Sequence, residues 1–564
     1  MNSETNSTIS WQAKTCQNCK SQFALDASDI GFYEKMGVPP PNLCPECRFK
    51  RRAVFRNERT LYKSTCKLCG KSVVTMYHPK SSYTTYCNDC WFSDKWDAGA
   101  YAQEYDSSRP FFDQLKQLSE KVPKSATYSS VHTGPNINSE YTNFAGGNKD
   151  CYLCFNSGPK NENCAYSRGL MNCKDTFDAY FGQETERTYE GVNVQKSSGV
   201  AWGQNAFECL DSWFLFNCSG VQNCFGCVSL RHKSNYFFNE PLSKEEWKKR
   251  VSEIAGSYRK TEEARKHFEE HALKFPRREN NNLKSVGCSG DYIFESKNCQ
   301  SSFEVGNGED LRYVFSVKAV KDSFDLIGHG RYSELLLEGV GVGVSQKVIG
   351  GWWVESSHDV EYSFATRSSE YCFGCDGIRN GKFRILNKQY TEKEYKTLRA
   401  KIVDELKSKN LYGLFMPPEL APFGYNETIG QDNLPLTKEE ALEQGFRWQD
   451  DIPMTRGQET LKPEQIPDYI KDVTDSILNE TLACISCGRN YRLIRQELEM
   501  YRRAMIPIPR KCFNCRHTDR LARRGAFKLF DRKCDKCGNG IKTNYAPDRP
   551  EIVYCEQCYQ AEVI

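Results

Sequence analysis

The chain has 564 residues, too many for a single hydrophobic core, so several domains are expected. Its 77 lysines and arginines nearly balance 73 aspartates and glutamates, which excludes both a uniformly basic nucleic-acid coat and an acidic tail protein. The unusual feature is the presence of 28 cysteines with only 8 histidines. Many cysteines are typical of small domains that need disulfides in place of a core, and a chain of this length does not.

The first residues give an expectation about the compartment. The segment MNSETNSTISWQAK lacks the basic stretch and apolar run of a secretory signal. The most apolar stretch, 335–353, is interrupted by Glu338, Gln346 and Lys347, which is too polar for a membrane span. We therefore expect a soluble, cytoplasmic protein without a membrane partner. In that setting, closely spaced cysteines bind metal or act in catalysis rather than form structural disulfides.

A cysteine-rich module near the N-terminus recurs at the C-terminus. Each copy contains four pairs of cysteines separated by two residues, and every position in the second copy is the first plus 468. The match includes other residue types, such as Tyr33 with Tyr501. The paired cysteines are Cys16, Cys19, Cys44, Cys47, Cys66, Cys69, Cys87 and Cys90 in the first copy and Cys484, Cys487, Cys512, Cys515, Cys534, Cys537, Cys555 and Cys558 in the second.

Each module is predicted to hold two closed Zn(Cys)4 sites. A Cys-x2-Cys turn brings two thiolates to one ion while backbone N–H groups donate to the sulfurs, and a second turn completes a tetrahedral site with no position for substrate. The intervals from Cys19 to Cys44 and from Cys69 to Cys87 suit the short hairpin or helix that separates the two turns of a zinc ribbon. We expect four zinc ions per chain. The ligands could come from sequential turns or from a cross-braced arrangement.

The sequence around these turns resembles a known family. The run from Cys16 to Arg48 contains Phe32, Tyr33 and VPPPNLCPECR, and the later turns read CKLCGK, YCNDCW, CDKCGN and YCEQCY. This order is similar to that of uncharacterised zinc-ribbon proteins of candidate-phyla bacteria, which have probable zinc-ribbon domains at both ends and a repetitive centre. The resemblance covers nearly the full length. It implies zinc binding but no established activity.

The centre of the chain repeats with a period of twelve. A recurring position, usually preceded by Asp or Asn, returns from Cys164 to Tyr236, and QNCFGC at 222–227 matches EYCFGC at 370–375 in a second copy. The recurring positions expected in the second copy are Cys299, Leu311, Ser323, Leu335 and Lys347, followed after one inserted residue by Val360, Cys372 and Arg384.

This period predicts a mainly β fold. Twelve residues accommodate one strand and a turn, and stacked units bury a continuous core only beside their neighbours. We therefore predict a central β-solenoid or β-helix-like repeat domain, flanked by duplicated double zinc-ribbon modules and carrying short helical insertions. A parallel β-helix of about 24 residues per coil is favoured, because a coil of one period would be too narrow for the aromatic side chains. A long antiparallel meander is the alternative.

The remaining cysteines lie in this repetitive region. Residues i and i+3 of a strand point to opposite faces, so the pairs among them are poorly placed to share one ion. We therefore interpret most of them as small buried residues of the core. They are Cys151, Cys154, Cys164, Cys173, Cys209, Cys218, Cys224, Cys227, Cys288, Cys299, Cys372 and Cys375.

These patterns predict six consecutive segments. Residues 1–100 form the first double ribbon, and residues 101–240 form the first half of the repeat domain. A charged helical insertion follows at 241–284, and the second half of the repeat occupies 285–410. A proline-containing linker spans 411–480, and the second double ribbon spans 481–564.

Local charge suggests the function. Residues 488–533 contain 14 lysines and arginines against 4 acidic residues, with aromatic residues interleaved. Because arginine with aromatics suits phosphate contacts and base stacking, the first hypothesis is a non-enzymatic zinc protein that binds nucleic acid, with RNA or a ribonucleoprotein favoured. The predicted contacts are Arg48, Arg51, Arg52, Arg56, Arg516, Arg520, Arg523 and Arg524.

Two other classes of function stay open. The alternative is a structural or protein-interaction scaffold in which the ribbons cap a β-solenoid. A third hypothesis is a carbohydrate-active enzyme that uses Asp322, Asp325 or Glu334, although the sequence contains no phosphate loop, nucleophile elbow or HExxH motif. The oligomeric state and the identity of any protein partner are not set by these patterns.

Overall fold

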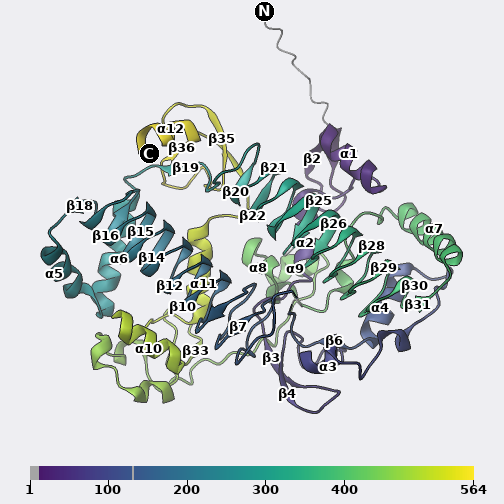
Figure 1. Ribbon diagram of the computed structural model, residues 1–564, viewed down its shortest axis with the longest axis horizontal. Helices are drawn as coiled ribbons and strands as arrows, with labels where there is room; N and C mark the ends of the chain where they lie inside the picture. Colours follow the sequence, from purple (N-terminus) through teal and green to yellow (C-terminus); the bar gives the residue numbers. More distant parts are fainter. Residues whose placement is uncertain (1–11, 130–131, 329, 564) are drawn as a thin grey trace, which may run out of the picture. The chain divides into compact units, whose positions relative to one another are not determined.

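The chain forms two compact units in a computed structural model that describes residues 12–129, 132–328 and 330–563 (Figure 1). Unit 1 consists of Met1–Ala126 and Asn280–Asp450, and unit 2 consists of Thr127–Glu279 and Asp451–Ile564. The N-terminal ribbon module therefore shares a unit with the second repeat half, and the C-terminal module shares one with the first half. Chain order does not decide which segments pack together.

In unit 1, two ribbons follow each other. The first contains β1 (Gln12–Thr15), β2 (Gln22–Leu25), α1 (Ala27–Met36) and α2 (Pro45–Ala53), and the second contains β3 (Tyr62–Thr65), β4 (Ser72–Thr75), β5 (Thr85–Tyr86) and α3 (Asn88–Phe92). Helix α1 begins where Asp26 and Asp29 form a reciprocal capping box, and it ends at Gly37, whose φ of 68° suits glycine. The segment η1 (Ala98–Tyr101), α4 (Phe111–Lys121) and β6 (Lys124–Ser125) completes this part of the unit.

The C-terminal module in unit 2 repeats this order. Its elements are β32 (Leu482–Ala483), β33 (Asn490–Tyr491), α10 (Arg495–Ala504), α11 (Phe513–Arg524), β34 (Phe530–Lys533), β35 (Gly540–Thr543), β36 (Val553–Tyr554) and α12 (Glu556–Val563). In each module the strand before the last helix pairs in parallel with a short strand outside the ribbons: β5 with β6, and β36 with β19 (Arg277–Arg278).

Each repeat half forms one sheet of 12 strands. The first sheet contains β7 (Asn148–Lys149), β8 (Asn161–Glu162), β9 (Arg168–Met171), β10 (Lys174–Phe177), β11 (Tyr180–Gln183), β12 (Glu186–Tyr189), β13 (Val192–Gln195), β14 (Ser198–Phe207), β15 (Leu210–Ser219), β16 (Gln222–Val228), β17 (Ser234–Phe237) and β18 (Glu240–Pro241). The second contains β20 (Gly290–Phe294), β21 (Lys297–Gln300), β22 (Ser302–Gly306), β23 (Glu309–Arg312), β24 (Phe315–Lys318), β25 (Val320–Ile327), β26 (Ser333–Val340), β27 (Gln346–Ile349), β28 (His358–Glu361), β29 (Glu370–Phe373), β30 (Lys382–Ile385) and β31 (Lys388–Gln389).

The strands pair in parallel with partners one period of twelve farther along the chain. Thr176 pairs with Thr188, and Val200 pairs with Ser212 in the same register. The prediction of about 24 residues per repeat is therefore wrong. The antiparallel meander is excluded too, because among the described strands of each sheet only the final short one, β18 or β31, pairs antiparallel.

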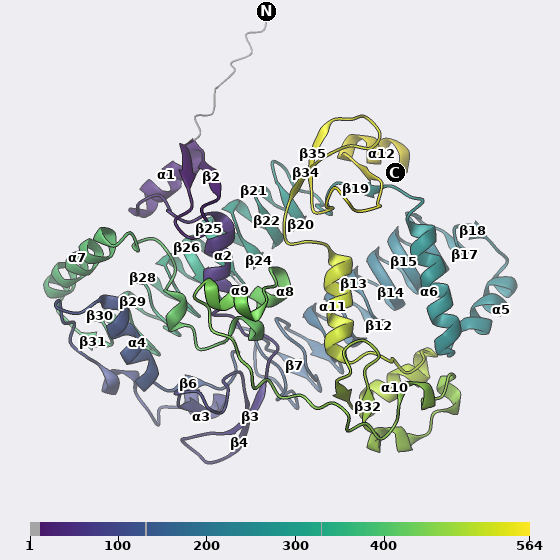
Figure 2. The same ribbon diagram turned by 180° about the vertical axis from the view of Figure 1, so that it is seen from behind.

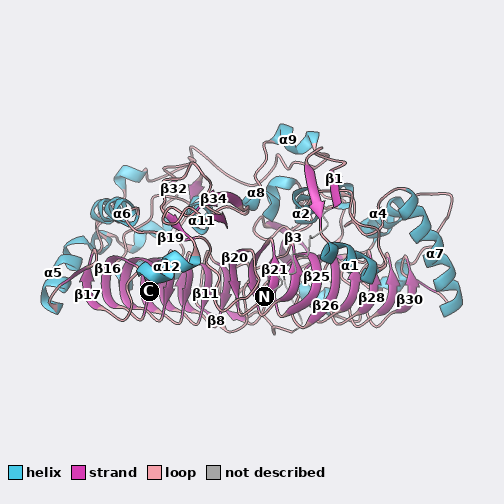
Figure 3. Ribbon diagram, turned by 90° about the horizontal axis from the view of Figure 1, so that it is seen from above, coloured by secondary structure: helices cyan, strands magenta, loops and turns pink. Residues whose placement is uncertain are grey.

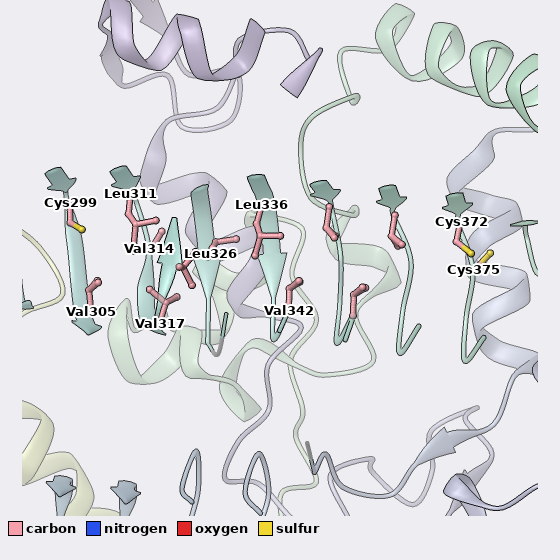
Figure 4. Packing of buried hydrophobic residues seen from close by; sticks show 14 of the residues in the cluster. Cys299, Val305, Leu311, Val314, Val317, Leu326, Leu336, Val342, Cys372 and Cys375 are labelled. Carbon is pink, nitrogen blue, oxygen red and sulfur yellow. The ribbon is translucent and has the colours of Figure 1, made fainter. Parts of the chain in front are cut away.

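The single inserted residue of the second copy lies elsewhere than expected. Phe324 in β25 pairs with Leu337 in β26, an offset of 13, whereas Leu336 pairs with Val348 at an offset of 12. The insertion therefore lies between β25 and β26. The recurring core positions are Leu336 and Val348, not Leu335 and Lys347, and Figure 4 shows Leu336 in line with the other buried residues of this sheet.

The core of each sheet consists of every third residue. From Cys164 to Cys227, each third residue is buried, and the residue before each of them has a positive φ. Such a residue turns the backbone, so side chains three positions apart point the same way rather than to opposite faces. Asn and Asp occupy many of these positions because they tolerate the left-handed conformation best among non-glycine residues.

The aromatic side chains lie outside this narrow core. Trp202 stacks on Phe214 with ring centroids 4.7 Å apart, and Trp352 stacks on Phe364 at 4.0 Å. Cysteine, valine, serine and glycine are common in the interior instead. Because the rings pack outside the core, a repeat of only twelve residues can carry many of them. In each unit the ribbons and most of the helices lie on one side of the sheet (Figure 3).

The remaining helices lie between and after the sheet segments. They are α5 (Lys244–Ile254), α6 (Tyr258–Ala272), α7 (Glu392–Ser408), α8 (Ile429–Asn433) and α9 (Lys438–Glu443), with the 3-10 turns η2 (Pro418–Leu420), η3 (Tyr425–Glu427), η4 (Pro463–Gln465), η5 (Ile470–Asp472) and η6 (Asp475–Asn479). Within the described ranges, none of the helices is both long enough and apolar enough to cross a bilayer.

Candidate metal centres and ribbon docking interface

The sixteen predicted ligand cysteines form four groups of four. Within each group the sulfur atoms all lie within 4.8 Å of one another. The grouping is sequential, so the cross-braced alternative is not what this fold adopts. The groups are Cys16, Cys19, Cys44 and Cys47; Cys66, Cys69, Cys87 and Cys90; Cys484, Cys487, Cys512 and Cys515; and Cys534, Cys537, Cys555 and Cys558.

The sulfur–sulfur distances fit a tetrahedral metal site. Cys19 Sγ and Cys44 Sγ are 3.6 Å apart, and Cys69 Sγ and Cys87 Sγ are 3.8 Å apart. Four sulfurs at the zinc–sulfur distance of about 2.3 Å would be separated by about 3.8 Å. A disulfide would bring the two atoms to about 2.05 Å. The donor set and spacing therefore suit a Zn(Cys)4 ion.

Local structure prepares the cysteines for metal. In the first tetrad of each module, the second cysteine turn begins a helix: Cys44 caps α2 and Cys512 caps α11. The positive end of the helix dipole favours thiolates there. Burial raises the pKa of the Cys66 thiol, but N–H groups led by that of Cys87, 3.2 Å from the sulfur, bring this pKa down to about 6. Backbone donors likewise bring the pKa of Cys534 to about 6 against burial.

In unit 1, helix α2 docks on the sheet through two arginines. The helix packs against β25 and β26 (Figure 2), and Arg48 and Arg52 lie one helical turn apart on it. Arg48 Nε donates to both carboxylate oxygens of Asp325 at 3.0 Å, and Arg52 contacts Asp325 at 3.0 Å and Glu338 at 2.5 Å. All four side chains are at most 1% exposed.

In unit 2, helix α11 makes the corresponding contacts. Arg516 Nε lies 3.0 Å from Asp178, and Arg520 Nη1 lies 2.9 Å from Asp178 and 3.3 Å from Glu190. Arg516 also pairs with Glu497 of the ribbon itself, at 3.2 Å. These guanidinium groups are buried.

The two interfaces are copies of each other. Arg516 and Arg520 are Arg48 and Arg52 plus 468, and Asp178 corresponds to Asp325 at an offset of 147. Glu190 corresponds to Glu338 at 148, because the inserted residue lies between the two positions. The structure thus pairs duplicated cations with duplicated carboxylates in both units.

The other predicted nucleic-acid contacts also have partners inside their own unit. Arg51 donates to Phe415 O, Arg56 to Glu58, Arg523 to Glu190, and Arg524 to the hydroxyl of Tyr180. Of the eight arginines, Arg48, Arg52, Arg56, Arg516, Arg520 and Arg524 are buried. Their placement does not support contact with nucleic acid, because phosphate could reach these groups only after the ribbon left the sheet.

The central cysteines behave as core residues. Eleven of the twelve are buried, and Cys288 is half-buried. The reasoning that i and i+3 residues face opposite ways is wrong for this backbone: Cys224 and Cys227 both point into the core of the first sheet. Even so, within 12–129, 132–328 and 330–563, only the four ribbon tetrads bring three or more potential metal ligands together.

The acids of the enzyme hypothesis do not form one site. Asp322 pairs with Lys35 at the surface at 3.0 Å, and Asp325 belongs to the buried arginine cluster. Glu334 instead accepts from Gln346 on the exposed face of the second sheet. Asp178, Glu190 and Glu338 were missed as functional residues, although their matching positions in the two halves are visible in the sequence.

Comparison of the chain with protein-family models and with curated proteins finds no match.

Proposed function

We propose that the protein is a non-enzymatic, zinc-dependent scaffold. In this proposal each sheet is a β-solenoid that carries a double zinc ribbon docked on its side and presents surfaces to protein partners. The observation that carries the proposal is the duplicated arginine–carboxylate interface. Each ribbon module uses its most basic helix to hold its own sheet.

Zinc is the metal we assign to the four tetrads. Four thiolates at these separations match its preference, and a closed tetrahedral site serves folding rather than catalysis. Since Cys44 and Cys47 flank the start of α2, the ion fixes the helix that presents Arg48 and Arg52. Metal binding and ribbon docking are thereby coupled.

This scaffold hypothesis takes precedence over nucleic-acid binding. A nucleic-acid surface needs cations that are free to meet phosphates. Arg48, Arg52, Arg516 and Arg520 instead neutralise buried carboxylates. Much of the positive charge of residues 488–533 is thus engaged inside unit 2.

Hydrogen–deuterium exchange with and without a zinc chelator tests the proposal. Removing metal should release α2 and α11, so amides of β25, which packs against α2, and of β11 and β13, which pack against α11, should exchange faster. Amides of β28 and β29, which pack less closely against α2, supply the internal control. Unchanged exchange in β25, β11 and β13 after complete metal loss would contradict the proposed coupling.

A further inference from the structure

A cavity of about 330 Å³ opens in unit 1 beside the first zinc turn. Its walls are β1 with the following turn, the segment 39–42, and the end of α7 with residues 410–414. The lining combines apolar surface from Pro39, Tyr412 and Leu414 with the amines of Lys14 and Lys407. This volume and mixture are typical of a site for a small ligand or a few residues of peptide.

The polar groups at this cavity are incompletely used. Asn42 donates through Nδ2 to Gln17 and to Asn410 O, both at 3.0 Å. Its Oδ1 atom is buried and accepts no hydrogen bond from the part of the chain that the structure describes. Lys14 Nζ donates to Pro40 O at 3.3 Å and to Pro41 O at 3.2 Å, which uses two of the three N–H groups of this amine. A ligand with a hydrogen-bond donor could bind Asn42 Oδ1, and a ligand with an anionic group could bind the Lys14 amine.

The duplicate of this region in unit 2 is filled by the chain itself. Arg510 stands at the position of Asn42, and equivalent backbone bonds, Gln17 N to Asn42 O and Ile485 N to Arg510 O, are both 3.0 Å. Arg510 Nη2 donates to Ile466 O at 2.8 Å and to Pro467 O at 3.1 Å. The segment around Ile466 and Pro467, which directly follows the 3-10 turn η4, therefore occupies the C-terminal counterpart of the cavity.

In unit 2 the same segment also contacts the edge of the hairpin formed by β32 and β33. Leu461 forms a parallel bridge with Leu482 of β32, and Thr460 N donates to Thr481 O at 2.8 Å. Leu482 corresponds to Lys14 of β1. Among the described residues, β1 pairs only with β2 and its other edge has no strand partner. In unit 1 the chain reaches Asn410 through helix α7 instead, and no segment of the described ranges pairs with that edge.

We propose that the β1 edge and the adjoining cavity bind an extended, acidic, proline-containing segment of another protein. The backbone of such a segment would pair with the free edge of β1 and extend the single bridge that the chain's own segment makes at β32 through Leu461 and Leu482. Its proline and apolar side chains would enter the cavity, and its carboxylates would meet Lys14 and Lys407. This inference rests on the proposed scaffold function and names where the scaffold takes a partner.

A peptide with the sequence of residues 457–469, GQETLKPEQIPDY, is the probe. It carries three acidic residues and one lysine and reproduces the segment that fills the C-terminal copy. Fluorescence anisotropy of the labelled peptide with the full-length zinc-loaded protein should show saturable binding. Lys14→Glu should weaken it about tenfold, because an attraction becomes a repulsion. Lys407→Glu should also weaken it, because this exposed lysine lines the cavity, with its ammonium group over the ring of Tyr412.

Matched controls separate this site from others. Lys71→Glu changes an exposed lysine of the second ribbon, away from the cavity, and should leave binding unchanged. A peptide with its acids changed to amides should bind more weakly. Binding that ignores both cavity variants, or no binding at all, overturns the inference.

Two other occupants of the site give distinct results. If the protein forms a dimer that Lys14→Glu dissociates, the inference is overturned, because a second copy of this chain would then occupy the site. Higher affinity after deletion of residues 2–11 would overturn it in favour of the chain's own N-terminal segment. The scaffold proposal is tested separately, by the zinc content and by the change in hydrogen–deuterium exchange on metal removal. Failure of the peptide to bind, or either of these two outcomes, would leave those results unchanged.

Discussion

Arg48 Nε lies 3.0 Å from each carboxylate oxygen of Asp325, a residue 277 positions away in the chain, and neither side chain is exposed to solvent. A buried guanidinium and carboxylate owe their stability to each other, because either one alone would be an uncompensated charge in the interior. The same geometry recurs between Arg516 and Asp178. The ribbon modules are therefore integral parts of their units rather than appendages.

Removal of one partner should strongly destabilise unit 1. We expect Arg48→Ala to lower the free energy of unfolding by about 3–5 kcal/mol, because Asp325 would remain buried without its main counter-charge. Urea unfolding followed by tryptophan fluorescence measures the loss. Arg516→Ala should have a comparable effect in unit 2.

The matched control is an exposed ion pair between the same ribbon and the same sheet. Lys35 and Asp322 are 3.0 Å apart, with side chains 50% and 44% exposed. Lys35→Ala should cost less than about 1 kcal/mol, since solvent screens that pair. If Arg48→Ala and Lys35→Ala lowered the free energy of unfolding equally, the prediction that the buried pair matters more than the exposed pair would be wrong.

Glu338 should give unit 1 a pH-dependent component of stability. Burial raises the pKa of Glu338 from 4.5 to about 7, with Asp325 adding to the rise and Arg52 opposing it. The folded state then binds this proton more tightly than the unfolded chain, so the contribution is present below pH 4.5 and is lost as pH rises through about 7. The stability of the wild type relative to Glu338→Gln should therefore fall between pH 4.5 and 7. Parallel urea titrations of both proteins measure it, and a difference that is constant with pH would contradict the assignment.

The central cysteines should be dispensable for metal but not for packing. Cys218 is fully buried in the first sheet. We expect Cys218→Ala to cost about 1 kcal/mol and Cys218→Leu to cost more, about 1–3 kcal/mol, because extra methylenes overpack a narrow core. Elemental analysis should find the same metal content in Cys218→Ala as in the wild type. A loss of one ion per chain would instead place a metal site in the repeat.

The ribbons were accessible to sequence reasoning because their constraint is local. Cys-x2-Cys turns such as Cys16 with Cys19 need only a short hairpin to place two sulfurs, and the offset of 468 marks the second copy. The partners of Arg48 were not accessible in this way. A cluster of arginines has the same local pattern whether it meets phosphate or a carboxylate 277 positions away.

The repeat shows a second limit. The period of twelve predicts a strand and a turn, with side chains that alternate between two faces. The sequence also contains a shorter period, in which small or aliphatic residues recur at every third position, such as Cys209, Ser212, Leu215 and Cys218. These residues share one face only because the residue before each core position has a left-handed backbone conformation. That backbone choice is set by stacking against the neighbouring strands, and propensities for extended strands do not predict it.

Metal should leave the tetrad of Cys534 before it leaves the tetrad of Cys16. In the tetrad of Cys534, only one of four ligands is buried and Cys537 is exposed, whereas three of four are buried in the tetrad of Cys16. A chelator must reach the ion as thiolates detach, so exposure should set the order of release. With a chromophoric chelator at neutral pH, release should be multiphasic, and Cys537→Ser should remove the fast phase only. Cys19→Ser, which changes the exposed ligand of the other tetrad, is the matched control and should remove a slow phase instead. A single phase of four ions, or loss of the slow phase in Cys537→Ser, would contradict this order.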